Sequence, residues 1–188
     1  MIRILLLFLI FNIYTFAHPH VFFTSDFTIN IENNEIKTLD ITVFLDELNT
    51  VLFSENLPQD RNILQNDLPF YENVIHDIHL EWNGANKVVN PIFENASLDN
   101  DILKLSIKVP IYEKIESNSS LIFSIYDSEY FYTYDYEKED FHLNINNTDF
   151  STKLSLKENL KKPFYYGMVY PKEFEVNFYW RKNLLFYC

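Results

Sequence analysis

The chain has 188 residues and a formal net charge of -12, and 47% of its residues are hydrophobic. This acidic balance argues against nucleic acid as a partner, because proteins that bind nucleic acid carry basic patches. The chain has only two glycines, so we expect no glycine-rich phosphate loop and no bound nucleotide. The single cysteine, Cys188, excludes an intramolecular disulfide.

Residues 1–17 have the pattern of a secretory signal peptide. Arg3 precedes an apolar run over residues 4–13, and small residues at positions 15 and 17 suit a signal peptidase. The apolar run is shorter than the roughly 20 residues that a membrane-spanning helix needs. We therefore predict cleavage after Ala17, a periplasmic location, and a mature chain of residues 18–188 that forms a single periplasmic domain.

Cleavage at that position would make His18 the mature N-terminus, followed by Pro19 and His20. A free α-amine and two imidazoles would then lie close together, and these donors suit zinc, copper or nickel. Pro19 has no amide hydrogen, which excludes a copper site that uses the second backbone amide as a ligand. In the alternative interpretation, Pro19 stiffens an ordinary strand start between two solvated histidines.

The first structural elements are predicted to be two strands within residues 21–45, joined by a polar turn at 32–35. Apolar side chains alternate with polar ones from Phe23 to Ile31, which is the period of a half-buried strand. The following segment changes to a helical spacing and is interrupted by Pro58. We predict a short helical insertion near residues 47–75.

The rest of the chain is predicted to form short strands separated by turns, with an asparagine–glycine turn at 83–86. These strands are expected at residues 78–82, 88–89, 91–96, 102–109, 121–127, 130–136, 141–145 and 174–179. The fold class is therefore mostly β, an antiparallel β-sandwich-like single domain with a short helical insertion.

Three acidic residues are candidate metal ligands besides the histidines. Asp46 and Glu47 lie where a strand ends and a helix begins, so either could cap the helix or supply an oxygen ligand towards the His18–His20 strand. Asp127 precedes a stretch in which tyrosines alternate with other residues. Such tyrosines usually pack on a sheet, and a stacking platform for a sugar is the minority interpretation.

The other histidines are weaker candidates. His76 and His79 lie where the predicted helix gives way to a strand, and the simpler interpretation is two polar residues at a helix end. His142 is expected to be packed or exposed. The chain has no Gly-x-Ser-x-Gly motif and no cysteine pair, so we do not expect an enzyme. The lysines of the C-terminal third are interpreted as solvated surface: Lys153, Lys157, Lys161 and Lys162.

Three motifs together resemble domain-of-unknown-function family one thousand and seven. They are His18-Pro19-His20-Val21-Phe22, Leu45-Asp46-Glu47 and Tyr126-Asp127-Ser128-Glu129-Tyr130-Phe131. The resemblance implies a periplasmic component associated with nickel/cobalt-type or other metal transporters. Many members carry an EF-hand-like loop after the Asp-Glu motif. Residues 55–67 lack its Asp-x-Asp-x-Asp-Gly pattern, which argues against bound calcium here.

Three functions follow from these observations. The first is a transition-metal-binding accessory protein that holds zinc, nickel, cobalt or copper through His18 and His20 and serves an inner-membrane metal permease. The second is a non-enzymatic interaction or assembly module that docks a permease, with a structural His-Pro-His start. The third is a copper enzyme built on the N-terminal histidine, which requires a further imidazole from His76, His79 or His142 nearby.

Overall fold

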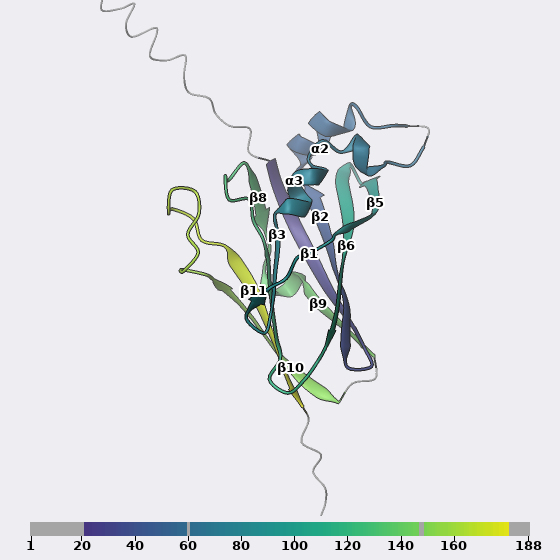
Figure 1. The fold of residues 1–188 in the computed structure, drawn as a ribbon. Helices are drawn as coiled ribbons and strands as arrows, with labels where there is room; N and C mark the ends of the chain where they lie inside the picture. Colours follow the sequence, from purple (N-terminus) through teal and green to yellow (C-terminus); the bar gives the residue numbers. More distant parts are fainter. Residues whose placement is uncertain (1–20, 60, 147–148, 181–188) are drawn as a thin grey trace, which may run out of the picture.

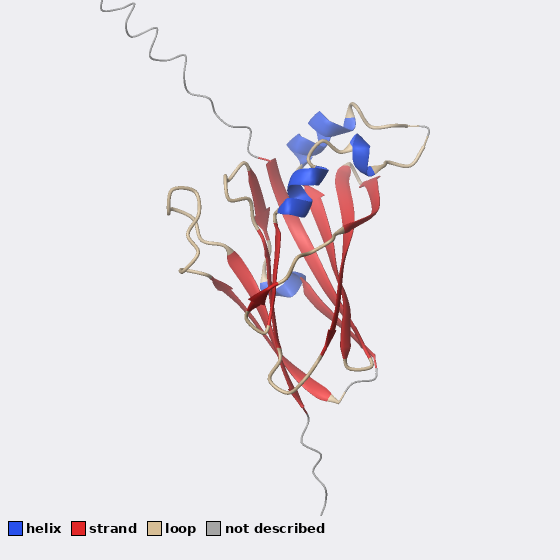
Figure 2. Cartoon of the chain, in the orientation of Figure 1, coloured by secondary structure: helices blue, strands red, loops and turns tan. Residues whose placement is uncertain are grey.

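The computed structural model describes residues 21–59, 61–146 and 149–180, and strands predominate within them (Figures 1 and 2). The strands form two sheets that share one hydrophobic core. This arrangement confirms the predicted mostly-β, sandwich-like fold with a short helical insertion. In the described part of the chain, none of the helices has the length and apolar character needed to cross a membrane.

The first sheet has the order β5-β6-β2-β1, and β8 and β9 both pair with the other edge of β1. The last two pairings are parallel, so the antiparallel arrangement that the sequence predicts does not hold at this edge. β8 and β9 pair with successive parts of β1, with the short 3₁₀ helix η2 (Lys138–Asp140) between them. The chain therefore runs in the same direction as β1 through both strands. The strands are β1 (Val21–Glu32), β2 (Glu35–Leu45), β5 (Ile92–Asp99), β6 (Ile102–Lys114), β8 (Tyr132–Asp135) and β9 (Phe141–Asn146).

The second sheet has the order β10-β11-β7-β3-β4, and its pairings are antiparallel. The edge strand β10 is not among the predicted elements, because its lysines suggest solvated surface. The strand predicted at residues 88–89 is wrong, since these residues lie on the connection from β4 to β5, which crosses between the sheets. The strands are β3 (Ile78–Trp82), β4 (Ala85–Asn86), β7 (Ser120–Ile125), β10 (Phe150–Glu158) and β11 (Lys172–Trp180).

The core follows from the alternation along each strand. In β1 the buried positions begin at Val21 and recur at every second residue up to Ile31, as the sequence predicts. Phe27 shows how the two sheets meet, because its ring lies 5.3 Å from that of Phe123 and 5.4 Å from that of Phe174, both in the second sheet. Burial of such large rings is the main favourable contribution to folding.

The helical insertion covers the end of the sandwich at which β1 begins (Figure 1). It consists of α2 (Glu47–Ser54), the 3₁₀ helix η1 (Gln65–Asp67) and α3 (Tyr71–His76). Phe70 precedes α3, is buried, and lies 5.7 Å from the ring of Phe23 in β1. The insertion therefore closes the core next to the start of β1.

Candidate functional site

The first two residues of β1 are held from both sides by backbone hydrogen bonds. The Phe22 carbonyl accepts a hydrogen bond from the Asp46 amide at 3.1 Å, and the Phe22 amide donates to Asp46 Oδ2 at 3.3 Å. On the other side, the Val21 amide donates to the Phe131 carbonyl at 3.2 Å. The three sequence motifs thus meet at one place, since the second and third motifs flank the residues that follow His20.

Asp46 is the N-cap of α2, as one of its two predicted roles requires. Its Oδ1 accepts the Asn49 amide at 2.9 Å, and its Oδ2 accepts the Asn49 side-chain amide at 2.6 Å. Partial burial alone would raise the pKa of Asp46, but the hydrogen bonds from Asn49 and Phe22 outweigh it and hold the pKa below its ordinary value. The carboxylate is therefore charged at neutral pH and ties the helix start to β1.

Asp127 organises the turn on the opposite side of β1. It is only 9% exposed, and its Oδ1 accepts the Glu129 amide at 2.9 Å. Its Oδ2 accepts the amides of Phe131 at 2.7 Å and Tyr132 at 3.1 Å. This loop positions the Phe131 carbonyl that receives Val21, so Asp127 supports the strand start indirectly.

The remaining predicted ligands are distributed as follows. Glu47 is exposed in the first turn of α2, and His18 and His20 lie outside the described residues. Within residues 21–59, 61–146 and 149–180, no three His, Cys, Asp or Glu side chains are grouped closely enough to hold a metal ion.

The hydrogen bonds of Asp46 and Asp127 give both residues a structural role. Each carboxylate accepts three hydrogen bonds, and a carboxylate offers about four acceptor positions in all. Both groups are therefore engaged in positioning backbone, and their role as metal ligands stays a prediction.

His76 and His79 are separated by the helix–strand boundary. His76 is the last residue of α3, and His79 lies on the exposed face of β3, where its ring stacks on Tyr126 at 4.1 Å. His142 is an exposed residue of β9. The helix-end interpretation thus holds for His76, while His79 packs on the outer face of the second sheet.

The tyrosines of β8 pack on the sheet, as their alternation predicts. Tyr134 stacks on Phe23 at 5.1 Å, and its hydroxyl donates to Asp77 Oδ2 at 2.6 Å. Burial raises the pKa of Asp77 to about 7, despite the opposing effect of the Tyr134 hydroxyl, and the charge of Asp127 adds to the rise. Sequence analysis did not single out Asp77, and its position between His76 and a strand gives no signal of burial.

An aromatic pocket of about 430 Å³ opens beside the strand start. Phe22 and Tyr130 line one side of the pocket. Phe164, Val169 and Tyr170, from the connection between β10 and β11, line the other side. This connection, residues 159–171, forms a hairpin closed by a bridge between Phe164 and Val169. The hairpin therefore lies at the same end of the molecule as the start of β1.

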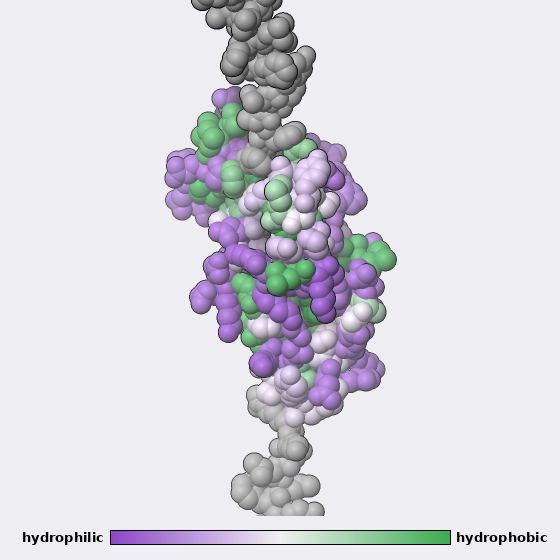
Figure 3. Space-filling view, turned by 90° about the vertical axis from the view of Figure 1, so that its left-hand side faces the viewer, coloured by the Kyte–Doolittle hydropathy of each residue, from purple (hydrophilic) through white to green (hydrophobic). Residues whose placement is uncertain are grey.

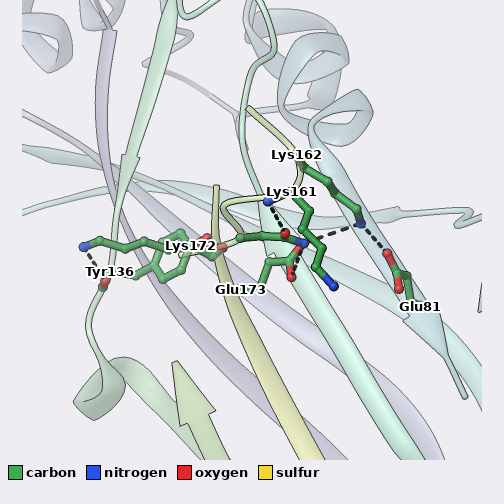
Figure 4. A network of polar contacts seen from close by, with 7 residues as sticks. Glu81, Tyr136, Lys161, Lys162, Lys172 and Glu173 are labelled. Carbon is green, nitrogen blue, oxygen red and sulfur yellow. Dashed lines mark hydrogen bonds and ion pairs between the residues drawn. The ribbon is translucent and has the colours of Figure 1, made fainter. Parts of the chain in front are cut away.

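A charged network fixes the base of this hairpin to the second sheet (Figure 4). Glu173 of β11 is only 3% exposed, and both of its oxygens accept from the Asn159 side chain at 2.9 Å. Lys162 lies 3.5 Å from Glu173 and also pairs with Glu81 of β3. Lys162 is exposed, as its interpretation as solvated surface predicts, and it also pairs with two carboxylates of the second sheet, one of them buried.

A second pair of contacts joins the two sheets beside this network. The Tyr136 hydroxyl donates to the Lys172 carbonyl at 2.5 Å, and the Lys172 ammonium donates to the Tyr136 carbonyl at 3.1 Å. Because Tyr136 follows β8 and Lys172 begins β11, these bonds hold the hairpin beside the strand that pairs with the start of β1.

Comparison with known proteins identifies one family. The family described as "Protein of unknown function (DUF1007)" matches residues 3–163, which span the chain from before β1 to the hairpin after β10. No curated protein matches the sequence. Since the match covers most of the chain and contains all three motifs, the protein belongs to the DUF1007 family.

Proposed function

We propose that the protein is a periplasmic transition-metal-binding accessory of a metal transport system. In this proposal His18 and His20 hold a zinc, nickel, cobalt or copper ion, which is cargo destined for an inner-membrane metal permease. The observation that carries the proposal is the anchoring of β1 directly after His20. Asp46 on one side and the Asp127 loop on the other fix Val21 and Phe22.

Anchoring matters because a metal hook binds more tightly when its donors are already confined. The α-amine and imidazole of His18 and the imidazole of His20 would be attached to a strand whose next residues cannot move independently. These nitrogen donors suit the later first-row divalent metals. A site with so few protein donors would also release its ion readily, as a delivery protein requires.

The acidic residues have distinct parts in this proposal. Asp46 accepts a hydrogen bond from the amide of Phe22, two residues after His20, and in this proposal it holds the strand start to which the hook is attached. Glu47 is exposed beside Asp46, and in this proposal it is a candidate oxygen ligand. Asp127 acts through the backbone of its loop.

Titration calorimetry of the exported protein with zinc tests the proposal. His18→Ala and His20→Ala should each weaken binding at least tenfold, since each removes a donor to the ion. Lys157→Ala is the matched control, because Lys157 lies on the edge strand β10, pairs with Glu175 and is not a proposed donor. If the double histidine variant binds zinc as tightly as the unaltered protein, the proposal is wrong.

The alternative is a non-enzymatic interaction or assembly module with a structural His-Pro-His start. It is favoured by the hydrogen bonds of Asp46 and Asp127, which give both residues a role without any metal. Undiminished zinc binding by the double histidine variant, or no zinc binding by any form, would favour this alternative.

A further inference from the structure

Exposed apolar side chains gather at the end of the molecule where β1 begins. Two elements present most of them, the helix α2 and the 159–171 hairpin, and they flank the strand start (Figure 1). Figure 3 looks onto the side that carries the hairpin and shows weakly polar and apolar atoms towards this end. We call this surface the apolar end, and its residues are Phe22, Leu48, Val51, Leu52, Phe131, Tyr166 and Met168.

The tip of the hairpin carries an exposed aromatic side chain on backbone that has an unfavourable conformation. Tyr165, Tyr166 and Gly167 have φ values of 47°, 58° and 76°, and this left-handed region is unfavourable for residues with a side chain. Asparagine or glycine would form the same turn with less strain. Tyr166 is nevertheless 92% exposed and Met168 is 66% exposed. The exposure of Tyr166 and Met168 leaves both side chains accessible at the tip.

Helix α2 presents a second apolar surface. Leu48, Val51 and Leu52 follow the spacing of one helix face, and Leu48 is 70% exposed. On its other side the helix packs on the sandwich through buried Asn49 and Thr50. The Leu103 amide of β6 donates to the Thr50 hydroxyl at 3.1 Å. The same helix packs Phe53 against buried Phe70 at 5.0 Å, and the face with Leu48, Val51 and Leu52 stays exposed.

Both surfaces adjoin the point at which the N-terminal segment joins the domain. Asp46 links α2 to Phe22, and Phe22 shares a pocket with the hairpin. The twenty residues before Val21 include the apolar run at positions 4–13. About seven residues connect that run to β1, and they reach at most about 25 Å when extended. A leader held in the membrane during export would therefore keep this end of the domain close to the bilayer.

We propose that the apolar end docks on the surface of a lipid bilayer, with the hairpin tip and the α2 face entering the interfacial region. Tyrosine is enriched at that depth because its ring is apolar and its hydroxyl remains hydrated. Leucine and methionine side chains on the two projections supply the apolar area that interfacial binding requires. Docking in this way would hold the residues before β1 at the membrane. The proposal does not depend on metal binding.

The charge of the protein makes the proposal specific about the lipid. With a net charge of -12, the protein gains no general attraction to an anionic bilayer. Of the three lysines at the hairpin, Lys162 and Lys172 are paired with carboxylates, and Lys161 has no ion pair with a described residue. Binding should therefore be apolar in origin, occur on neutral phosphatidylcholine, and change little with salt.

Co-sedimentation of the exported, processed protein with phosphatidylcholine vesicles tests the proposal. The double variant Tyr166→Ser/Met168→Ser should lose about tenfold in partitioning, and Leu48→Ser/Leu52→Ser should lose a similar factor. All four side chains are exposed, so both variants should keep the circular dichroism spectrum of the unaltered protein. Tyr112→Ser is the control, because Tyr112 is 66% exposed on β6 near the opposite end of β1.

Several outcomes would overturn the proposal. They are no sedimentation of the unaltered protein, sedimentation only on vesicles with anionic lipid, and an equal loss in Tyr112→Ser. Sedimentation on native inner-membrane vesicles but not on pure lipid would assign the surface to a membrane protein instead. The histidine variants should sediment normally and the serine variants should bind zinc normally, so failure of docking is separable from failure of the metal proposal.

Discussion

Asp77 gives the sharpest test of the packing described above. Its carboxylate lies at the junction of α3 and β3 and accepts the hydroxyl of Tyr134 from the other sheet. Burial raises its pKa from 3.8 to about 7. Replacing Asp77 with Asn keeps an oxygen that can accept the Tyr134 hydroxyl and removes the titration.

The sign of the effect follows from proton binding. Between about pH 4 and pH 7 the folded protein keeps a proton on Asp77 that the unfolded chain has released, so stability falls as pH rises through this window. From pH 5 to pH 7 the change spans about two units at 1.36 kcal/mol each, which is ~3 kcal/mol. For a domain of this size that corresponds to a melting temperature about 10 °C lower.

The assay is thermal unfolding of both proteins at pH 5, 6, 7 and 8, followed by circular dichroism. We expect the melting temperature of Asp77→Asn, relative to that of the unaltered protein, to rise by about 10 °C between pH 5 and pH 8. Other titrating groups are shared by the two proteins, so they cancel in the difference. If the difference in melting temperature is the same at every pH, Asp77 titrates normally and the reasoning about its burial is wrong.

Four further results are expected. Asp46→Ala should lower the free energy of unfolding by ~1 kcal/mol in urea denaturation, through loss of the helix cap, and Asp46→Asn should restore most of it. Asp127→Ala should cost about 2 kcal/mol because it removes the charged acceptor of three part-buried hydrogen bonds from backbone amides, and a cost near zero would contradict that role. Lys162→Met should destabilise the protein by about 1 kcal/mol, because Glu173 then keeps its hydrogen bond from Asn159 but loses the ion pair with Lys162. The same substitution should cost less in a protein that already carries Glu173→Gln, which has no charge at position 173. Mass spectrometry of the exported protein should find His18 as its first residue, and a different start would remove the α-amine from the proposed hook.

The site was accessible to sequence analysis only in part. The motifs around Asp46 and Asp127 could be recognised because their chemistry is local, since a carboxylate that caps a helix or a turn bonds to amides within five residues. That both motifs flank the same strand start could not be predicted. It depends on pairing between β1 and residues more than 100 positions away.

The sequence by itself determined the fold class, the helical insertion and the family, because alternation, helical spacing and short motifs are properties of neighbouring residues. Tertiary structure alone decided that β8 and β9 run parallel to β1, that Asp77 is buried beneath Tyr134, and that Lys162 is drawn to Glu173. Each of these features joins segments from different parts of the chain. Strand direction, the burial of a side chain and the ion pairs it makes depend on the segments that pack against it, so they cannot be predicted from the neighbouring residues in the sequence.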